Sequence, residues 1–346
     1  MTGITETMFV LSAVEILQPE EIVGVLINGL SKAALYIMIA AGLTIIFGLI
    51  GVVNFAHGSM TMLGAYLGGF VIATIAPGGV LSLVAFAVAA VVVLLVLTVA
   101  GGLMEKALIK PIYDRSPVYH ILLTLGVAFV LDELIAIGAT LLDGATLLDI
   151  DVISPWQDPI DAMPDFLAST YTAVGASFRG LDIFEIAIGV IAVALIWLFL
   201  NRTKYGLYIR ACTEDAEMAE ALGIDVPRTF TVVFGVGVGL AGVAGLLLAW
   251  DIQGLMGQGG GATIFLSAGV LLPAFVVVIV GGLGSFEGTV VAGVLIGFID
   301  AVATWLFVNE VVTFSALPEI AIFVILIVAL AVRPRGIFGS EEVTIN

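Results

Sequence analysis

The sequence predicts an all-α fold: a polytopic transmembrane helix bundle with about nine spans, in a range of about eight to ten. Of the 346 residues, 61% are hydrophobic and only 11% are charged, and the mean hydropathy is +1.23. A soluble domain has about a quarter of its residues charged. The apolar runs are continuous and lack the alternation of a membrane β-barrel, so we expect each crossing to be a helix that satisfies its own backbone hydrogen bonds.

Stretches almost without charge mark the crossings. Residues 22–104 hold a single formal charge, Lys32, and residues 229–286 hold only Asp251. About 20 apolar residues cross the hydrocarbon core of a bilayer. The predicted spans are residues 22–50, 58–76, 79–103, 119–142, 181–201, 228–250, 265–281, 287–308 and 311–332.

Three pairs of glycines predict where these helices pack closely. Each pair has the G-x-x-x-G spacing that lets two helix backbones approach one another. The pairs are Gly64 and Gly68, Gly235 and Gly239, and Gly293 and Gly297. Any compact bundle needs such contacts, so these glycines point to packing rather than to a particular function.

The basic residues predict the orientation in the membrane. Nine of the eleven fall on one side when the nine spans are threaded in order: Lys106, Lys110, Arg115, Arg202, Lys204, Arg210, Arg228, Arg333 and Arg335. Because cytoplasmic loops carry the excess of Lys and Arg, we place the C-terminus in the cytoplasm and the N-terminus outside. The expected parts of this multi-pass cell-membrane protein are an extracytoplasmic segment 1–21, a transmembrane domain 22–332 with an external loop 143–180 and a cytoplasmic loop 202–227, and a cytoplasmic tail 333–346.

The chain is strongly acidic, with 28 Asp and Glu against 11 Lys and Arg and a formal net charge of −17. Nucleic-acid binding needs a basic patch, which this composition does not supply. Most carboxylates lie outside the predicted spans. The exposed surfaces are therefore expected to resemble those of salt-adapted proteins, with ordinary acidic loops as the alternative.

No pattern typical of an enzyme is present in the sequence. No lysine follows the G-x-x-x-x-G of a P-loop, no G-x-S-x-G elbow occurs, and the two histidines are distant from each other and from the single Cys212. We therefore expect no catalytic residue, no metal and no cofactor bound by this chain. A membrane bundle without such groups is expected to move a solute.

The cytoplasmic loop 202–227 contains a predicted amphipathic helix over residues 213–223. Thr213 is expected to be its N-cap and Gly223 the residue that ends it. The residues assigned to this loop element are Arg210, Glu214, Asp215, Glu217, Met218, Ala219, Leu222 and Gly223, of which Met218, Ala219 and Leu222 share one face. A helix lying on a membrane would carry Lys and Arg on its polar face, whereas this face is acidic, so docking on a partner protein is favoured.

Two glycine-rich breaks, at residues 51–58 and 281–288, each join an apolar segment to a following helix. Transporters often place their pathway at such paired interruptions. The predicted pathway residues are Asn54, Phe55, His57, Gly58, Gly284 and Ser285. The alternative is that Asn54 and His57 only satisfy backbone groups freed where a helix ends.

Asp132 and Glu133 are the adjacent acids that lie well inside a predicted span. Ionisable groups in a bilayer are costly and therefore candidates for function. An ion-coupled secondary carrier would use such carboxylates. The alternatives are that they pair with each other, cap a helix end or line a subunit contact.

Several segments, in chain order, resemble the branched-chain amino acid permeases of the ABC importers. They are Gly42–Gly48 with Asn54–Gly58, Gly206–Arg210 with Glu220–Ile224, Gly282–Ser285, and Arg333–Gly339. The resemblance covers nearly the whole chain. It implies a membrane subunit that pairs with a second homologous permease. Two cytoplasmic ABC ATPase subunits would use the ATP, and an extracytoplasmic substrate-binding protein would deliver leucine, isoleucine or valine. It also implies that the loop around residues 214–223 couples this chain to an ATPase.

Two features depart from the family pattern. The external loop 143–180 is longer than the family leads us to expect, and Glu287 stands where a small or apolar residue is expected after Gly-Ser. Related permeases move urea, short amides or sugars, so the sequence leaves the identity of the solute open.

Overall fold

The computed structural model describes residues 18–75, 79, 81–142, 145–147, 150–152, 163–251 and 266–339. Over these residues the chain is mainly helical. The longer helices are α2 (Pro19–Ile50), α3 (His57–Ile75), α4 (Leu81–Met104), α5 (Pro117–Leu142), α8 (Gly180–Arg202), α11 (Val226–Leu248), α12 (Leu266–Gly281), α13 (Phe286–Val308) and α14 (Leu317–Val332). Six of them are long and apolar enough to cross a membrane: α2, α4 with its continuation to Ile112, α5, α8, α11 and α13. Helices α12 and α14 are apolar but shorter.

Each predicted span corresponds to one of these nine helices, so the expectation of a polytopic all-α bundle is confirmed. The largest difference is at α14, which begins at Leu317 rather than near residue 311. Pro318 lies in its first turn, where the missing N–H of proline costs no intrahelical hydrogen bond. Pro318 therefore lies at the start of this helix.

Short elements connect the long helices. They are the π-helix η1 (Glu105–Ile109), the 3-10 helix η2 (Lys110–Ile112), α7 (Asp165–Ala168), α9 (Lys204–Glu214), α10 (Ala216–Ala221), and the strands β1 (Ala145–Leu147), β2 (Ile150–Val152), β3 (Thr170–Ala173) and β4 (Ala176–Arg179). The strands form two antiparallel hairpins, with Thr146 opposite Asp151 and Tyr171 opposite Phe178. Both hairpins fall in the predicted external loop 143–180, of which residues 143–144, 148–149 and 153–162 lie outside the described part.

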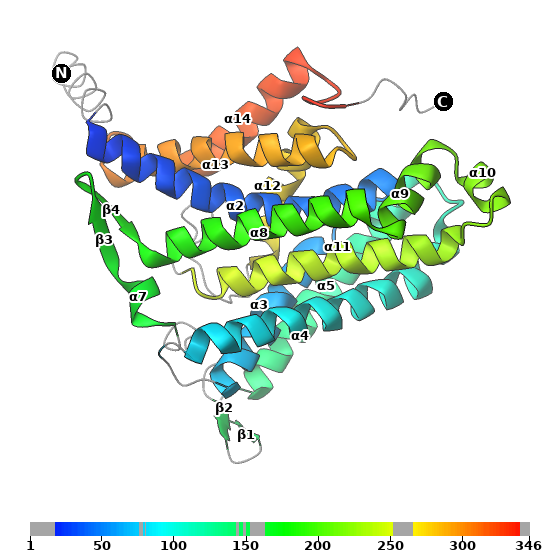
Figure 1. Cartoon of the computed structure of the whole chain (residues 1–346), viewed down its shortest axis with the longest axis horizontal. Coiled ribbons are helices and arrows are strands. Elements are labelled where there is room, and N and C mark those ends of the chain that lie inside the picture. The colour runs from blue at the N-terminus through cyan, green and yellow to red at the C-terminus, as the bar shows by residue number, and fades with distance from the viewer. Residues whose placement is uncertain are drawn as a thin grey trace.

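The core forms around α2, which packs against α13, α11 and α8. In its most apolar stretch 83% of the residues are buried, against 17% in α5. Figure 1 shows β3, β4, α7 and the start of α2 at one end of the bundle, which we call the hairpin end. α9 and α10 lie at the opposite end, which we call the α9–α10 end. The other helices therefore pack around α2.

Small residues let the helices cross closely, as the glycine spacing predicted. A Cβ on Gly64 would lie 2.3 Å from the carbonyl oxygen of Gly242 in α11. A Cβ on Gly297 would lie 2.6 Å from the carbonyl oxygen of Gly29 in α2. Because backbone rather than a movable side chain occupies these positions, α3–α11 and α13–α2 contacts require glycine.

A buried ion pair joins α2 to α13. Lys32 Nζ lies 2.7 Å from Asp300 Oδ1, and the Tyr36 hydroxyl donates to Asp300 Oδ2 at 2.7 Å. Lys32 also donates to the Thr304 hydroxyl at 2.8 Å. With both charges compensated and hydrogen-bonded, the cost of burying them is offset, and Lys32 is explained as a helix–helix contact.

A second ionic cluster fixes the hairpin end. Arg179 pairs with Asp182 at 2.7 Å and with Asp251 at 2.9 Å, which ties the end of β4 and the start of α8 to the end of α11. Burial alone would lower the pKa of Arg179, but the charges of Asp251 and Asp182 outweigh it and raise that pKa. These ion pairs therefore hold the end of β4, the start of α8 and the end of α11 together.

Candidate functional site

The first glycine-rich break returns the chain into the bundle. α2 ends at Gly51, whose φ of 70° lets its N–H bond the Phe47 carbonyl at 2.8 Å. After a short extended stretch, α3 begins at His57 inside the protein, where Asn54 and His57 have no exposed surface. Asn54 Oδ1 accepts from the Ala56 N–H at 3.1 Å, and His57 Nε2 lies 3.0 Å from the Ile39 carbonyl oxygen. Asn54 thus serves a backbone group at the break, whereas His57 reaches across to a carbonyl in the middle of α2.

The second break crosses the end of α2. Gly282 and Gly284 have φ angles of 104° and 82°, and Ser285 caps α13 by accepting from the Gly288 N–H at 3.1 Å. Gly284 lies so close to α2 that a Cβ on Gly48 would be 2.8 Å from the Gly284 Cα. The second break therefore meets the last turn of α2, just before the first break, at the α9–α10 end of the bundle.

The C-terminal segment 333–339 is bound to this second break. The N–H groups of Ile337 and Phe338 donate to the carbonyls of Val280 and Gly281 at 2.8 and 3.0 Å. These bonds occupy carbonyls that the end of α12 leaves open. Residues 340–346 of the predicted tail lie outside the described part.

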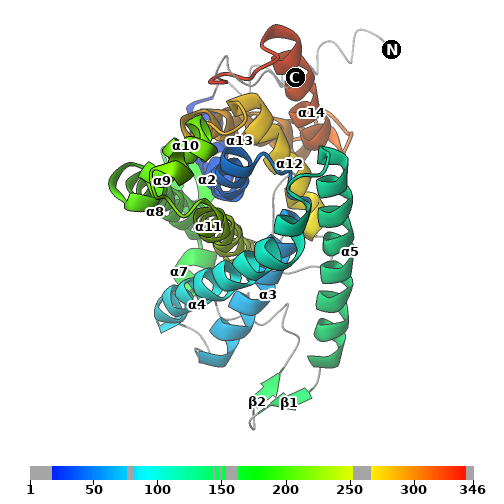
Figure 2. The ribbon, with the colours of Figure 1, turned by 90° about the vertical axis from the view of Figure 1, so that its right-hand side faces the viewer.

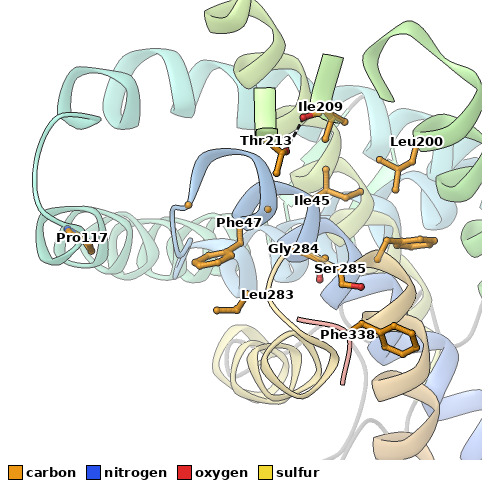
Figure 3. Close-up of a pocket in the computed structure, with 14 residues that line it drawn as sticks. Ile45, Phe47, Pro117, Leu200, Ile209, Thr213, Leu283, Gly284, Ser285 and Phe338 are labelled. Atoms are coloured by element: carbon orange, nitrogen blue, oxygen red, sulfur yellow. Dashed lines mark hydrogen bonds between the residues drawn. The ribbon is translucent and has the colours of Figure 1, made fainter. Parts of the chain in front are cut away.

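Two neighbouring hollows lie beside these breaks. The larger, of about 620 Å³, is shown in Figure 3 and is lined by the end of α2, by α9, by the α12–α13 turn and by Phe338. The smaller, of about 340 Å³, has a wholly apolar lining: Leu43, Phe47, Val53, Phe55, Phe275, Val278, Ile279 and Leu283. We call the larger one the cavity and the smaller one the groove. Phe47 and Leu283 line both, so these two side chains form the wall between groove and cavity.

The six predicted pathway residues divide into two groups. Phe55 lines the groove, and Gly284 and Ser285 line the cavity. Asn54, His57 and Gly58 line neither and are packed inside; a Cβ on Gly58 would lie 2.2 Å from the Ser267 carbonyl oxygen. A transport role for any of the six stays a prediction.

Apart from Phe55, sequence reasoning missed the aromatic and aliphatic lining of the groove. Phe47 lies within the Gly42–Gly48 segment that carried the family resemblance, which was the available signal. Phe275 packs on Phe55 with ring centroids 5.2 Å apart. No local pattern marks Phe275, because its position on α12 matters only once α12 lies against the first break.

The loop 202–227 forms two helices instead of the single helix predicted over 213–223. Thr213 lies inside α9, where its hydroxyl donates to the Ile209 carbonyl at 2.8 Å. Asp215 is the N-cap of α10 and accepts from the Met218 N–H at 2.9 Å. The expectation that Thr213 caps the helix is therefore wrong, because an equally good capping residue lies two positions later.

The end of α10 agrees with prediction. Gly223 has a φ of 89°, its N–H bonds the Glu220 carbonyl at 2.9 Å, and the Ile224 N–H bonds the Ala219 carbonyl at 3.0 Å. This is the pattern of a Schellman motif with glycine in the left-handed region. Gly223 therefore sets the direction in which the chain leaves α10.

The apolar side chains of this loop do not all face inward. Ala219 is buried, whereas Met218 and Leu222 are 57% and 77% exposed, in the midst of exposed acids. The exposed acids are Glu214, Asp215, Glu217 and Glu220. Arg210 holds α9 to the end of α8 by donating to the Leu200 carbonyl at 2.6 Å. The loop thus presents an apolar pair ringed by carboxylates at the α9–α10 end.

The structure separates the two acids predicted within α5. Asp132 accepts from the Ser267 hydroxyl at 2.7 Å and so joins α5 to α12, while Glu133 is exposed on the outward side. They do not form a pair with each other. Over the described residues, no three His, Cys, Asp or Glu side chains gather in a way that could hold a metal ion.

Comparison with known proteins places this arrangement in a family. Residues 25–333 match the model described as "Branched-chain amino acid transport system / permease component". The chain is 29% identical over 325 residues to the high-affinity branched-chain amino acid transport system permease protein BraD of Pseudomonas aeruginosa, covering 92% of this chain and 96% of that protein. It is 27% identical over 320 residues to the permease protein LivH of Escherichia coli K12, covering 91% and 95%.

A more distant organism gives a similar match. The probable branched-chain amino acid transport permease protein LivH of Methanocaldococcus jannaschii is 27% identical over 309 residues, covering 89% of each chain. Among solved structures, PsaBC from Streptococcus pneumoniae in complex with Fab aligns over 94% of this chain and 97% of that chain, with 15% identity and a TM-score of 0.41. The family model spans nearly all of the helical bundle, so this chain belongs to the permease-component family of the branched-chain amino acid transport systems.

Proposed function

We propose that this chain is the membrane-spanning permease subunit of an ATP-binding-cassette importer that moves branched-chain amino acids into the cell. In this proposal an external binding protein delivers leucine, isoleucine or valine, and a second homologous permease completes the pathway. Two cytoplasmic ABC ATPase subunits hydrolyse the ATP, and this chain performs no catalysis. The α9–α10 end then faces the cytoplasm and the hairpin end faces outside.

The observation that carries the proposal is that both glycine-rich breaks border one pair of neighbouring hollows. Interrupted helices are where transporters place their pathways. A solute that leaves the groove passes Phe47 and Leu283 to reach the cavity, and the cavity lies beside α9. The pathway therefore runs towards the end of the bundle where the ATPases bind.

The lining suits an amino acid with a branched aliphatic side chain. The groove offers only apolar side chains, which favour transfer of an aliphatic group out of water. The cavity adds the hydroxyl-bearing residues Ser285 and Thr213, and α13 begins at its wall. The positive end of the α13 dipole favours a carboxylate there. The wholly apolar groove, and the cavity with hydroxyl groups in a mainly apolar lining, thus suit the two halves of the proposed substrate.

The α9–α10 loop supports the proposed contact with an ATPase. Met218 and Leu222 expose apolar surface beside carboxylates, and such a patch on a water-facing loop is typical of a protein–protein contact. Ala219 packs inward and attaches the loop to the bundle. Movement of the ATPase would reach the cavity through α9, which lines it with Ile209 and Thr213.

Competition for uptake tests the substrate class. In vesicles that hold the complete importer, excess unlabelled isoleucine or valine is expected to suppress uptake of labelled leucine, while urea, acetamide and glucose leave it unchanged. Phe55→Ala should raise the KM for leucine because it removes groove lining, and Phe178→Ala in the external hairpin is the matched control. Equal competition by urea or glucose would overturn the amino-acid assignment.

A further inference from the structure

Helix α5 lies at the edge of the bundle and has two unlike faces. In Figure 2 it stands beside α3 and α12, with no helix of the described chain on its other side. In its most apolar stretch only 17% of the residues are buried. The outward face of α5 is therefore left to be covered by lipid or by another protein.

The inward face of α5 is held by hydrogen bonds. The Thr124 hydroxyl, which donates to the His120 carbonyl at 2.9 Å, also lies 3.2 Å from the Val53 carbonyl oxygen. The Ser59 hydroxyl donates to the Ala128 carbonyl at 3.3 Å, and Ser267 donates to Asp132. These contacts come at intervals of four residues along α5 and so lie on one side of the helix. They fix the rotation of α5 about its axis.

That rotation directs Glu133 outward. Its neighbours on the exposed face are large apolar side chains: Leu122 at 61% exposed, Phe129 at 66%, Val130 at 59% and Ile137 at 48%. Glu133 lies among them at helical spacing and is itself exposed. Glu133 lies about 24 Å along the helix from Pro117, where α5 begins, and about 14 Å from Leu142, where α5 ends, so it is inside the apolar helix.

Lipid is a poor neighbour for this carboxylate. A charged side chain within the hydrocarbon costs about 2.5–3.5 kcal/mol or more on insertion scales, and such residues almost always face protein or a water-filled space. The outward face of α8 is different: Ile191 and Leu195 are 53% and 60% exposed there among apolar neighbours. The α5 face therefore differs from an ordinary lipid-facing surface by one uncompensated charge.

A second copy of this chain does not supply the missing cation. A two-fold axis perpendicular to the membrane keeps every residue at its own depth. Among the described residues, the exposed Lys and Arg side chains lie at the α9–α10 end, where α5 begins, while Lys32 is buried and paired with Asp300. Arg179, at the hairpin end, is paired with Asp182 and Asp251.

We infer that the outward face of α5 is the docking surface for a different permease subunit, one that presents a basic side chain to Glu133 from a membrane-spanning helix. This inference rests on the proposed function, which requires a second permease. It assigns Glu133 to subunit pairing and leaves Asp132 as the internal link to α12. Because α5 contacts Val53 of the first break and Ser267 of α12, the partner docks beside these two elements.

Spin labels in the assembled importer test the inference. Single cysteines replace Val130 or Ile137 on α5, and Ile191 or Leu195 on α8 as matched controls, in a Cys212→Ala background. Each variant is purified with its co-expressed permease, ATPase and binding-protein partners, labelled with a nitroxide and placed in lipid bilayers. Collision with oxygen reports contact with lipid, and dipolar broadening reports a second label nearby.

Low oxygen accessibility on α5, high accessibility on α8 and no dipolar broadening are the expected results. Accessibility on α5 equal to that on α8 would mean that lipid covers this face and would overturn the inference. Broadening between labels on α5 would mean that two copies of this chain meet there and would overturn it as well. Neither result depends on which solute is carried, so leucine uptake in the same sample separates failure of this inference from failure of the proposed function.

The role of Glu133 is tested by changing its charge alone. Glu133→Gln should raise oxygen accessibility at the label on residue 130 towards the value on α8 and reduce the amount of second permease that copurifies, while Glu133→Asp retains both. Glu133 is exposed and forms no hydrogen bond or ion pair with the described residues, so the variant is expected to insert normally. If accessibility and copurification are unchanged in Glu133→Gln, Glu133 is not part of the contact with the second permease.

Discussion

Adjacent residues in the first break have different environments. Asn54 is fully buried and hydrogen-bonded to the Ala56 N–H, while Phe55 is partly exposed and lines the groove. The predicted pathway set is therefore uneven: the aromatic side chain faces a space a solute could occupy, and the amide supports the backbone of the break.

Cysteine labelling at these two positions tests the distinction. In a Cys212→Ala background, Phe55→Cys is expected to react with a small water-soluble thiol reagent and to be protected by leucine, while Asn54→Cys stays unlabelled. Cys212 is buried and burial raises the pKa of its thiol, but its removal leaves one reactive position. Labelling of Asn54→Cys with protection by leucine would show that the break itself, rather than its aromatic wall, meets the solute.

Gly223 is the second residue whose conformation decides its role. Its φ of 89° lies in the left-handed region, which costs a β-branched residue about 1–2 kcal/mol or more. Gly223→Val should therefore distort the exit from α10 and lower leucine uptake while the chain still inserts in the membrane. Gly223→Asn is the matched control because asparagine tolerates this region. Uptake by Gly223→Val equal to that of Gly223→Asn would contradict a coupling role for this turn.

At the scale of elements, α10 is expected to dock on an ATPase through its exposed apolar pair. Replacing Met218 and Leu222 together with serine removes that patch without touching buried Ala219. We expect the ATPase subunits no longer to copurify with the double variant, and a Glu214→Ala/Glu217→Ala variant to weaken the contact. Val174→Ser, a change at an exposed position of the β3–β4 turn, should leave copurification unchanged. Retained ATPase in both double variants would show that the contact lies elsewhere.

The link between α5 and α12 depends on Asp132. A hydrogen bond to a charged group contributes about 1.5–3 kcal/mol, so Asp132→Asn and Ser267→Ala should each lower the amount of folded protein in membranes. Uptake per folded molecule should remain driven by ATP and keep its dependence on pH. Normal folded levels together with lost gradient-driven uptake would instead identify Asp132 as a proton relay, as an ion-coupled carrier requires.

The positions of the long helices could be predicted from the sequence, because the length of an apolar run directly reflects the thickness of the membrane. The helix caps and the directions of individual side chains could not be predicted. Thr213 and Asp215 are both good capping residues, and only the packing of α9 selects the second. Asp132 and Glu133 lie about 100° apart around a helix, so one had to face away from the other, but which one faces the bundle is set by the contact with Ser267.

At the scale of the whole molecule, the site is an assembly of distant segments. The end of α2, the α12–α13 turn and Phe338 meet around one cavity although they are far apart in the chain. Glycines that allow these segments to approach, such as Gly48 and Gly284, belong to the segments that resemble the permease family. The sequence could not show that they touch, because close approach of two backbones leaves no local periodicity.

The central claim is that an ATPase, rather than an ion gradient, drives solute movement through this bundle. The most direct measurement is uptake of labelled leucine into right-side-out vesicles that hold the complete importer with its binding protein. We expect uptake when ATP is enclosed in the vesicles, none when ADP is enclosed, and no change when an imposed proton or sodium gradient is collapsed. Uptake without ATP that follows the imposed gradient, and is lost in Asp132→Asn at normal expression, would contradict the account and identify an ion-coupled carrier.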